Sequence, residues 1–336
     1  MHARKQQCLV LVGVIAIDLF MVARHSLAQE QVTADQMVTQ MEDTYGVHPG
    51  QRRNHTKGLC ALGEWVGSKE AATYSKSALF SGKTIPVIAR FSNAGGFPDA
   101  PDTAKSARGM ALEFKLPGNK LQHITMINTP MFGAATPKTF FDLLVATKPD
   151  ASTGKPDPKK VAAFKATHPD NRAQAEFLEK NNPPVSYANS DYFGIHTFKF
   201  INADNKTTLV RWKFVPQQGE KRLTDEQMKT MPANFLAQEL IDRTKKGPVR
   251  WDMLVWIGQP GDPEDNPTVL WPADRKQIKA GTLTITSAMP QKGAACEKIN
   301  YDPLVMAEGI EPTNDPILTF RSPAYAVSFA KRIQGK

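Results

Sequence analysis

The 336-residue chain predicts an α+β fold in which short antiparallel strands form a closed sheet. The clearest observation is a hairpin: Phe198 and Phe200 alternate with polar neighbours, residues 202–205 form the turn, and Trp212 and Phe214 alternate again. A second observation is that the helical segments lie apart from the strands, without regular βαβ alternation. A third is that the sequence contains no internal repeat and no G-x-G-x-x-G loop.

The same patterns place the other elements along the chain. Further strands are expected at 84–91, 110–116, 121–128, 251–257 and 282–286. Helices are expected at 33–45, where Thr33 and Gln36 form a capping box, at 159–166, at 171–180, and as one helix from Thr224 to Gly247. The two middle helices belong to a segment, 148–190, that we expect to cover the sheet. A last helix is expected to begin with Ser322 as its cap and Pro323 in its first turn.

The first 28 residues predict a secretory signal peptide. Arg4 and Lys5 precede an apolar run from Cys8 to Val22, and small residues at 26–28 offer a cleavage site. The run is shorter than the about 20 apolar residues of a membrane span, and Asp18 interrupts it, so an uncleaved anchor is the alternative. We therefore expect a single domain at 29–336, exported to the periplasm, with no stable membrane span after cleavage.

The charge of the mature chain excludes one class of partner. Cleavage lowers the formal charge from +9 to +7, because three basic groups and one acidic group leave with the leader. The remaining basic residues are scattered among acids, with no long basic run and no aromatic-interleaved stripe, so no nucleic-acid partner is expected. Of the three cysteines, Cys60 and Cys296 remain; the sequence leaves open whether they pair.

The C-terminal helix carries a candidate metal ligand. Arg321, Tyr325, Phe329 and Arg332 recur near one face, and all seven histidines lie at or before His196, so Tyr325 is the only axial ligand this helix offers. A neighbouring guanidinium favours the phenolate form of a tyrosine. By itself the pattern also suits a core tyrosine between two surface arginines.

Three more motifs precede this helix: Arg52-Arg-Asn-His55, Arg90-Phe-Ser92 and Asn128-Thr-Pro-Met-Phe132. In this order they resemble the motifs of the haem catalase family, and in particular those of its small catalase-related peroxidases. The resemblance runs from about Val47 to Arg332. It implies a catalase-like eight-stranded antiparallel β-barrel with added helices and a haem b cofactor. Since the chain has no C-x-x-C-H motif, the haem would not be attached covalently.

The resemblance also implies roles for individual residues. Tyr325 would be the proximal iron ligand, His55 the acid and base with a pKa near neutrality, Asn128 the residue that positions the peroxide, and Ser92 the hydrogen-bonding partner of His55. The cofactor-binding residues would include Arg52, Arg90 and Arg332, the aromatic Phe132 together with Phe140 or Phe141, and a hydrogen-bonded chain of Asp315, His196, Arg321 and Tyr325. The sequence does not choose between the two phenylalanines.

The chain departs from the catalase pattern at Asn54, Ser106, Gly133 and Phe329. In catalases these positions hold a channel valine, a channel aspartate, a second distal phenylalanine and a histidine. The changes imply a wider, more polar and less focused access route. They favour a peroxidase with weak catalase activity over rapid dismutation of peroxide.

The resemblance therefore predicts a haem enzyme that reduces hydrogen peroxide or small organic hydroperoxides with an unknown small electron donor. Because long N- and C-terminal arms are absent, we expect a monomer or a simple dimer. Two alternatives remain at this stage. One is a catalase-like enzyme that rearranges fatty-acid hydroperoxides, and the other is a secreted ligand-binding barrel without haem.

Overall fold

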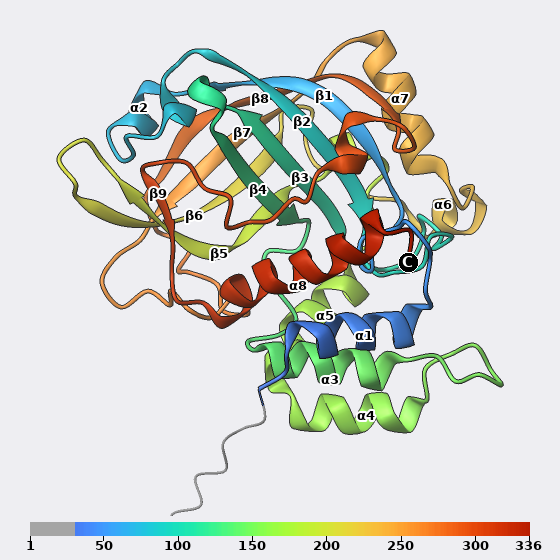
Figure 1. The fold of residues 1–336 in the computed structure, drawn as a ribbon. Helices are drawn as coiled ribbons and strands as arrows, with labels where there is room; N and C mark the ends of the chain where they lie inside the picture. The colour runs from blue at the N-terminus through green and yellow to red at the C-terminus, as the bar shows by residue number, and fades with distance from the viewer. Residues whose placement is uncertain (1–30) are drawn as a thin grey trace, which may run out of the picture. The chain divides into compact units, whose positions relative to one another are not determined.

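Eight antiparallel strands close into a barrel, as predicted (Figure 1). Each strand pairs with the next along the chain, β8 returns to β1, and the pair Ile127–Phe193 joins β4 to β5. The strands are β1 (Gly58–Gly67), β2 (Thr84–Asn93), β3 (Arg108–Lys115), β4 (Leu121–Ile127), β5 (Tyr192–Ile201), β6 (Thr207–Pro216), β7 (Val249–Ile257) and β8 (Gln277–Pro290). A short strand, β9 (Ile310–Pro312), extends the sheet beside β5.

This computed structural model describes residues 31–336, so the expected signal peptide at 1–28 lies outside the described residues. Val32–Lys336 form one compact unit. Its core is the barrel interior, where successive strand residues alternate between the two faces and place large aromatic side chains inside. Trp65, Phe91, Phe114, Phe214 and Trp251 are fully buried there. Burial of each such side chain contributes about 1.5–3 kcal/mol to stability.

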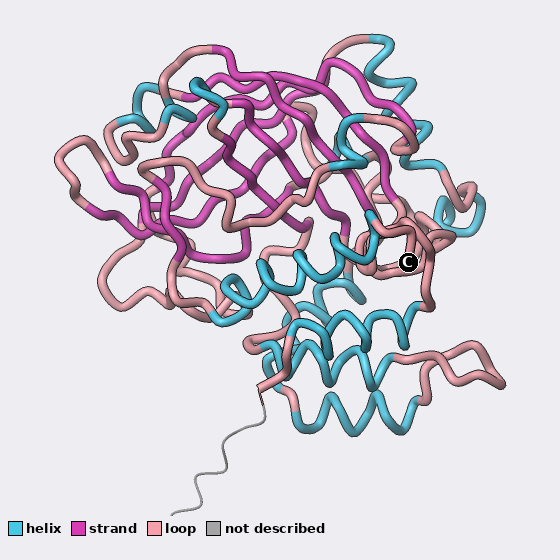
Figure 2. Tube along the Cα trace, viewed as in Figure 1, coloured by secondary structure: helices cyan, strands magenta, loops and turns pink. Residues whose placement is uncertain are grey.

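The helices lie mainly on two sides of the barrel. Figure 1 shows α8 between the barrel and a group formed by α1, α3, α4 and α5, and Figure 2 shows the same separation of helices and strands. α1 contacts α3 and α8, whereas α7 packs against β8. The helices are α1 (Ala34–Tyr45), α2 (Lys69–Ala72), α3 (Pro137–Thr147), α4 (Pro158–Thr167), α5 (Arg172–Lys180), α6 (Asp225–Thr230), α7 (Phe235–Lys246) and α8 (Pro316–Ile333).

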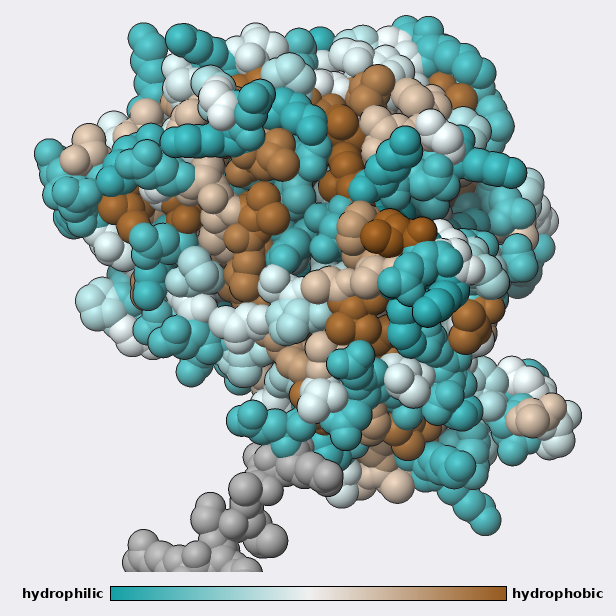
Figure 3. Space-filling view, in the orientation of Figure 1, coloured by the Kyte–Doolittle hydropathy of each residue, from teal (hydrophilic) through white to brown (hydrophobic). Residues whose placement is uncertain are grey.

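Short 3₁₀ turns complete the structure, at η1 (Ala78–Phe80), η2 (Pro117–Asn119), η3 (Pro169–Asn171), η4 (Tyr187–Asn189) and η5 (Ala295–Lys298). In the view of Figure 3 the surface is largely hydrophilic, and hydrophobic side chains gather over the barrel strands and around α8. Among residues 31–336 no helix is both long enough and apolar enough to span a membrane.

Two predicted helices are wrong in their bounds. The expected helix from Thr224 to Gly247 is two helices, because Pro232 lacks the N–H that a helix interior needs. The capping box of Thr224 and Gln227 is present but begins only the short α6.

The last helix also begins earlier than predicted. Its cap is Asp315, whose Oδ1 accepts hydrogen bonds from the N–H groups of Ile317 (2.8 Å) and Leu318 (3.2 Å). Ser322, the predicted cap, instead donates to Asp302 Oδ2, and Pro323 lies inside the helix.

Candidate active site

A cavity of about 910 Å³ lies between the barrel and helices α1, α3, α5 and α8. Its walls are mainly apolar, and several charged and polar side chains reach into it. The predicted site residues that line it are Arg52, His55, Arg90, Ser92, Phe132, Phe140, His196, Arg321, Tyr325 and Arg332. Asn128, Phe141 and Asp315 are not part of its lining. The barrel therefore gathers ten of the thirteen predicted residues around one space.

On the α8 side of the cavity, Tyr325 ends a hydrogen-bonded chain. Arg321 Nη2 donates to Tyr325 Oη at 2.8 Å, and Arg321 Nη1 donates to His196 Nε2 at 3.1 Å. Because a guanidinium can only donate, His196 Nε2 is the acceptor and the ring proton lies on Nδ1. That proton is donated to Asp315 Oδ2, with 2.7 Å between the heavy atoms. The one carboxylate thus caps α8 and fixes the tautomer of His196.

The same arginine has a further partner that the sequence analysis missed. Arg321 Nη2 also donates to Thr125 Oγ1 on β4, at 2.8 Å. The guanidinium of Arg321 therefore connects α8 to two barrel strands, β4 and β5. Its central carbon lies 5.3 Å from the centre of the Tyr325 ring. No local sequence signal marks Thr125, because its role depends on a contact with a residue 196 positions away.

His55, which lines the same cavity, is held in an unusual backbone conformation. Its φ is 53°, in the left-handed region that a histidine seldom adopts. Asn54 Oδ1 stabilises this turn by accepting hydrogen bonds from the N–H groups of His55 and Gly95, both at 2.8 Å. Asn54 lines the cavity as expected for an altered channel, and it also determines where the imidazole lies.

The imidazole of His55 rests against Ser92 and Gly109. Its Nδ1 lies 3.0 Å from Ser92 Oγ. A Cβ atom added to Gly109 would lie 2.7 Å from Ser92 Oγ and 2.9 Å from His55 Nδ1. Glycine is therefore required at position 109 for this hydrogen bond to form.

The environment of His55 keeps its imidazole neutral. Burial, and then the charges of Arg90, Arg321 and Arg52, lower the pKa of His55 to about 3. The expectation of a pKa near neutrality was wrong, because the sequence shows neither the desolvation of the ring nor the arginines that the fold brings near it. A neutral imidazole can accept a proton at neutral pH, which a catalytic base must do.

This pKa predicts a specific pH profile. If His55 is the base, the rate of reaction with peroxide should stay flat as the pH falls through 6.5, the ordinary pKa of histidine, because the ring remains unprotonated. The measurement is rapid mixing with peroxide between about pH 5 and pH 8. A decline centred near 6.5 would contradict a base with a depressed pKa.

Three arginines form a cationic wall on the cavity: Arg52, Arg90 and Arg332. Burial and the two neighbouring guanidinium groups lower the pKa of Arg52 to about 8, and burial lowers that of Arg90 to about 10. Among residues 31–336 neither of these two is paired with a carboxylate, and Arg332 Nη1 is buried without a hydrogen-bonding partner. The wall thus presents buried positive charge that an anionic ligand would neutralise.

The remaining predicted residues take less direct positions. Phe140 lines the cavity with its ring centre 5.5 Å from that of Phe132, whereas Phe141 does not line it. The structure therefore selects Phe140. Asn128 lies just after β4, where its Oδ1 accepts from the N–H of Arg108 at 2.7 Å. Its side chain is thus partly committed to the backbone.

The two other positions that depart from the catalase pattern in the channel, Ser106 and Gly133, contact neighbouring side chains. Ser106 Oγ accepts a hydrogen bond from Arg108 Nη1 at 2.9 Å. A side chain at Gly133 would clash with Gln174, which lines the cavity from α5 and which the sequence analysis missed. The side-chain amide of Gln174 therefore occupies the space beside Gly133.

The closed barrel, the arginine-held tyrosine and the facing histidine define a catalase-like protein. Residues 32–336 match the family model described as Catalase, so the chain belongs to the catalase family. It is 59% identical to a catalase-related peroxidase of Synechococcus elongatus, over 94% of this chain and 93% of that protein. It is 33% identical to a catalase-related peroxidase of Mycolicibacterium paratuberculosis, over 90% and 95% of the two chains. These matches support the small catalase-related peroxidase subgroup.

A solved bacterial catalase has the same fold. Its structure superimposes with a TM-score of 0.78 at 28% sequence identity, covering 85% of this chain and 58% of that chain. The match thus covers most of this chain but little more than half of the larger catalase.

Proposed function

We propose that the protein is a haem b-dependent peroxidase that reduces hydrogen peroxide or small organic hydroperoxides with an organic electron donor. Family membership makes it an oxidoreductase acting on peroxide. The observation that carries the finer proposal is that two hydrogen-bonded pairs, His55 with Ser92 and Tyr325 with Arg321, line one cavity.

The residues of the cavity fit a haem. Tyr325 would ligate the iron, and Arg321 would stabilise the phenolate by donating to its oxygen. Arg52, Arg90 and Arg332 would bind the propionates, which supply the negative charge that their wall lacks. Phe132 and Phe140 would pack against the ring. When bound, the haem would supply the redox-active iron that takes part in cleavage of the O–O bond.

His55 would move the proton that this cleavage requires. In the tautomer with Nδ1–H donated to Ser92 Oγ, Nε2 is free to take the proton from one peroxide oxygen. The same nitrogen returns that proton to the other oxygen, which leaves as water from hydrogen peroxide or as an alcohol from an organic hydroperoxide, so the imidazole ends as it began. Asn128 is proposed to orient the peroxide through its Nδ2, since its Oδ1 already accepts from the N–H of Arg108.

The cavity mouth supports a donor larger than peroxide. Phe97 is 41% exposed at the rim, and its ring lies 5.1 Å, edge to face, from that of Tyr45 on α1. Both residues line the same cavity as His55. An organic donor with an apolar body would therefore find a matching surface on its way to the haem edge.

Peroxidase turnover is expected to exceed oxygen release at low peroxide. The test follows oxygen evolution by electrode and dye oxidation in parallel on one preparation. Ser106→Asp, which restores the channel carboxylate of catalases, should shift turnover toward oxygen release, and Ser106→Asn is the uncharged control. Oxygen release far faster than oxidation of every small donor tried would show an ordinary catalase.

Export to the periplasm is proposed from the leader at 1–28, and the disulfide between Cys60 and Cys296 supports an oxidising compartment. The oligomeric state is proposed to be a monomer or a simple dimer. N-terminal sequencing of periplasmic protein and light scattering test these two proposals.

A further inference from the structure

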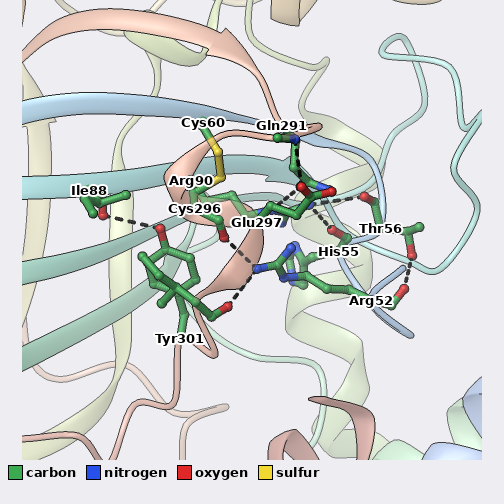
Figure 4. Close-up of a disulfide and its surroundings, with 12 residues drawn as sticks. Arg52, His55, Thr56, Cys60, Ile88, Arg90, Gln291, Cys296, Glu297 and Tyr301 are labelled. Atoms are coloured by element: carbon green, nitrogen blue, oxygen red, sulfur yellow. Dashed lines mark hydrogen bonds between the residues drawn. A yellow bond between two sulfur atoms is a disulfide. The ribbon is translucent and has the colours of Figure 1, made fainter. Parts of the chain in front are cut away.

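The segment 291–301 connects the arginine wall to the barrel. It follows β8, contains η5 and passes beside β1 and β2. Both ends of the segment lie close to the cavity. At the first end, Gln291 Oε1 accepts a hydrogen bond from Arg90 Nε at 2.6 Å, and at the other end Tyr301 lines the cavity. Figure 4 shows these side chains around the disulfide.

Main-chain carbonyls of the same segment hold the other two arginines. Arg52 Nη2 donates to the carbonyl oxygens of Cys296 (3.0 Å) and Ile299 (2.8 Å). Arg332 Nη2 donates to the carbonyl of Ile299 at 3.1 Å. Each of the three guanidinium groups of the wall therefore donates to this eleven-residue stretch of chain, and Arg90 Nη2 also donates to the carbonyls of His55 (2.7 Å) and Thr56 (3.1 Å).

Few hydrogen bonds fasten this stretch to the barrel. Its backbone–backbone hydrogen bonds are local, such as Glu297 N–H to Ala294 and Ile299 N–H to Cys296. Besides the contact between Gln291 and Arg90, one side chain of the segment forms a hydrogen bond to a barrel strand. Tyr301 Oη donates to the carbonyl of Ile88 on β2, at 3.4 Å. The covalent tie is the disulfide from Cys296 to Cys60 on β1, with 5.5 Å between the Cα atoms.

We propose that the Cys60–Cys296 disulfide is a positioning device for the arginine wall, and that it slows loss of the cofactor. The inference rests on the proposed haem function. Repulsion among three neighbouring guanidinium groups, two of them buried, favours their separation, so the carbonyls that hold them must themselves be held in place. Because Cys60 and Cys296 are 1% and 0% exposed, thiol reagents do not reach the bond in the folded protein. The disulfide therefore acts as a permanent tie and not as a redox switch.

The test compares haem loss from the wild-type holoprotein and from a Cys60→Ala/Cys296→Ala variant, in the presence of excess haem-free globin as acceptor. We expect haem loss to be on the order of tenfold faster in the variant, with unchanged far-ultraviolet circular dichroism. Leu240→Ala, in the α7 contact with the barrel, is the control for general destabilisation and should retain haem at nearly the wild-type rate. If the alanine pair does not fold, Cys60→Val/Cys296→Ala refills the lost volume.

A double-mutant cycle separates positioning from general stability. Arg52→Gln should accelerate haem loss less in the cysteine variant than in the wild type, because the disulfide acts through the same contact. The inference would be overturned if the effects of Arg52→Gln and of the cysteine substitutions were additive. It would also be overturned if the wild type and the cysteine variant lost haem at equal rates, or if the wild type contained two titratable thiols. A wild-type protein without a Soret band after expression with sufficient haem would instead overturn the proposed function.

Discussion

Tyr325→Phe is expected to give a folded protein that retains little or no haem. The change removes one hydroxyl group and with it the proposed iron ligand on α8, while the ring keeps its packing. Arg321 keeps its hydrogen bonds to His196 and Thr125, so the rest of the chain should stay in place. The measurement is the ratio of Soret to protein absorbance after expression with sufficient haem, together with circular dichroism.

Tyr192→Phe is the matched control for this experiment. It also removes a hydroxyl from a buried tyrosine, but one that donates a 3.1 Å hydrogen bond to the carbonyl of Tyr187 and does not line the cavity. This variant should retain haem. If Tyr325→Phe keeps an unchanged high-spin ferric spectrum, Tyr325 is not the ligand.

His55→Ala is expected to retain haem but to react with peroxide about 10²–10⁴-fold more slowly, the usual contribution of a positioned acid and base. The imidazole lines the cavity with Nδ1 on Ser92, and the other histidine of the lining, His196, has both ring nitrogens engaged by Asp315 and Arg321. Stopped-flow recording of the Soret change on mixing with peroxide measures this rate.

His123→Gln controls for loss of a buried histidine. His123 is 5% exposed and its Nε2 lies 2.9 Å from Glu113 Oε2, but it does not line the cavity. Its replacement should leave the peroxide reaction close to wild type. A wild-type rate in His55→Ala would assign His55 a structural role, in which Asn54 and the left-handed turn serve folding alone.

Much of the fold was predictable because it depends on local patterns. Period-two alternation identified the strands around Trp212 and Phe214, and the capping box at Thr33 identified the start of α1. The break between α6 and α7 could also have been predicted, since Pro232 is visible in the sequence. The start of α8 was missed because it was predicted from Ser322 and Pro323 as the cap and first turn, although Asp315 and Pro316 have the same pattern seven residues earlier.

The sequence by itself determined the order of the motifs, and with it the resemblance to the catalase family that the family match confirms. Tertiary structure alone decided which side chains meet. Cys60 and Cys296 pair across 236 positions, Phe140 and not Phe141 lines the cavity, and Thr125 reaches Arg321. It alone decided the charge of His55 too, because desolvation and three arginines brought from distant segments act only in the folded chain.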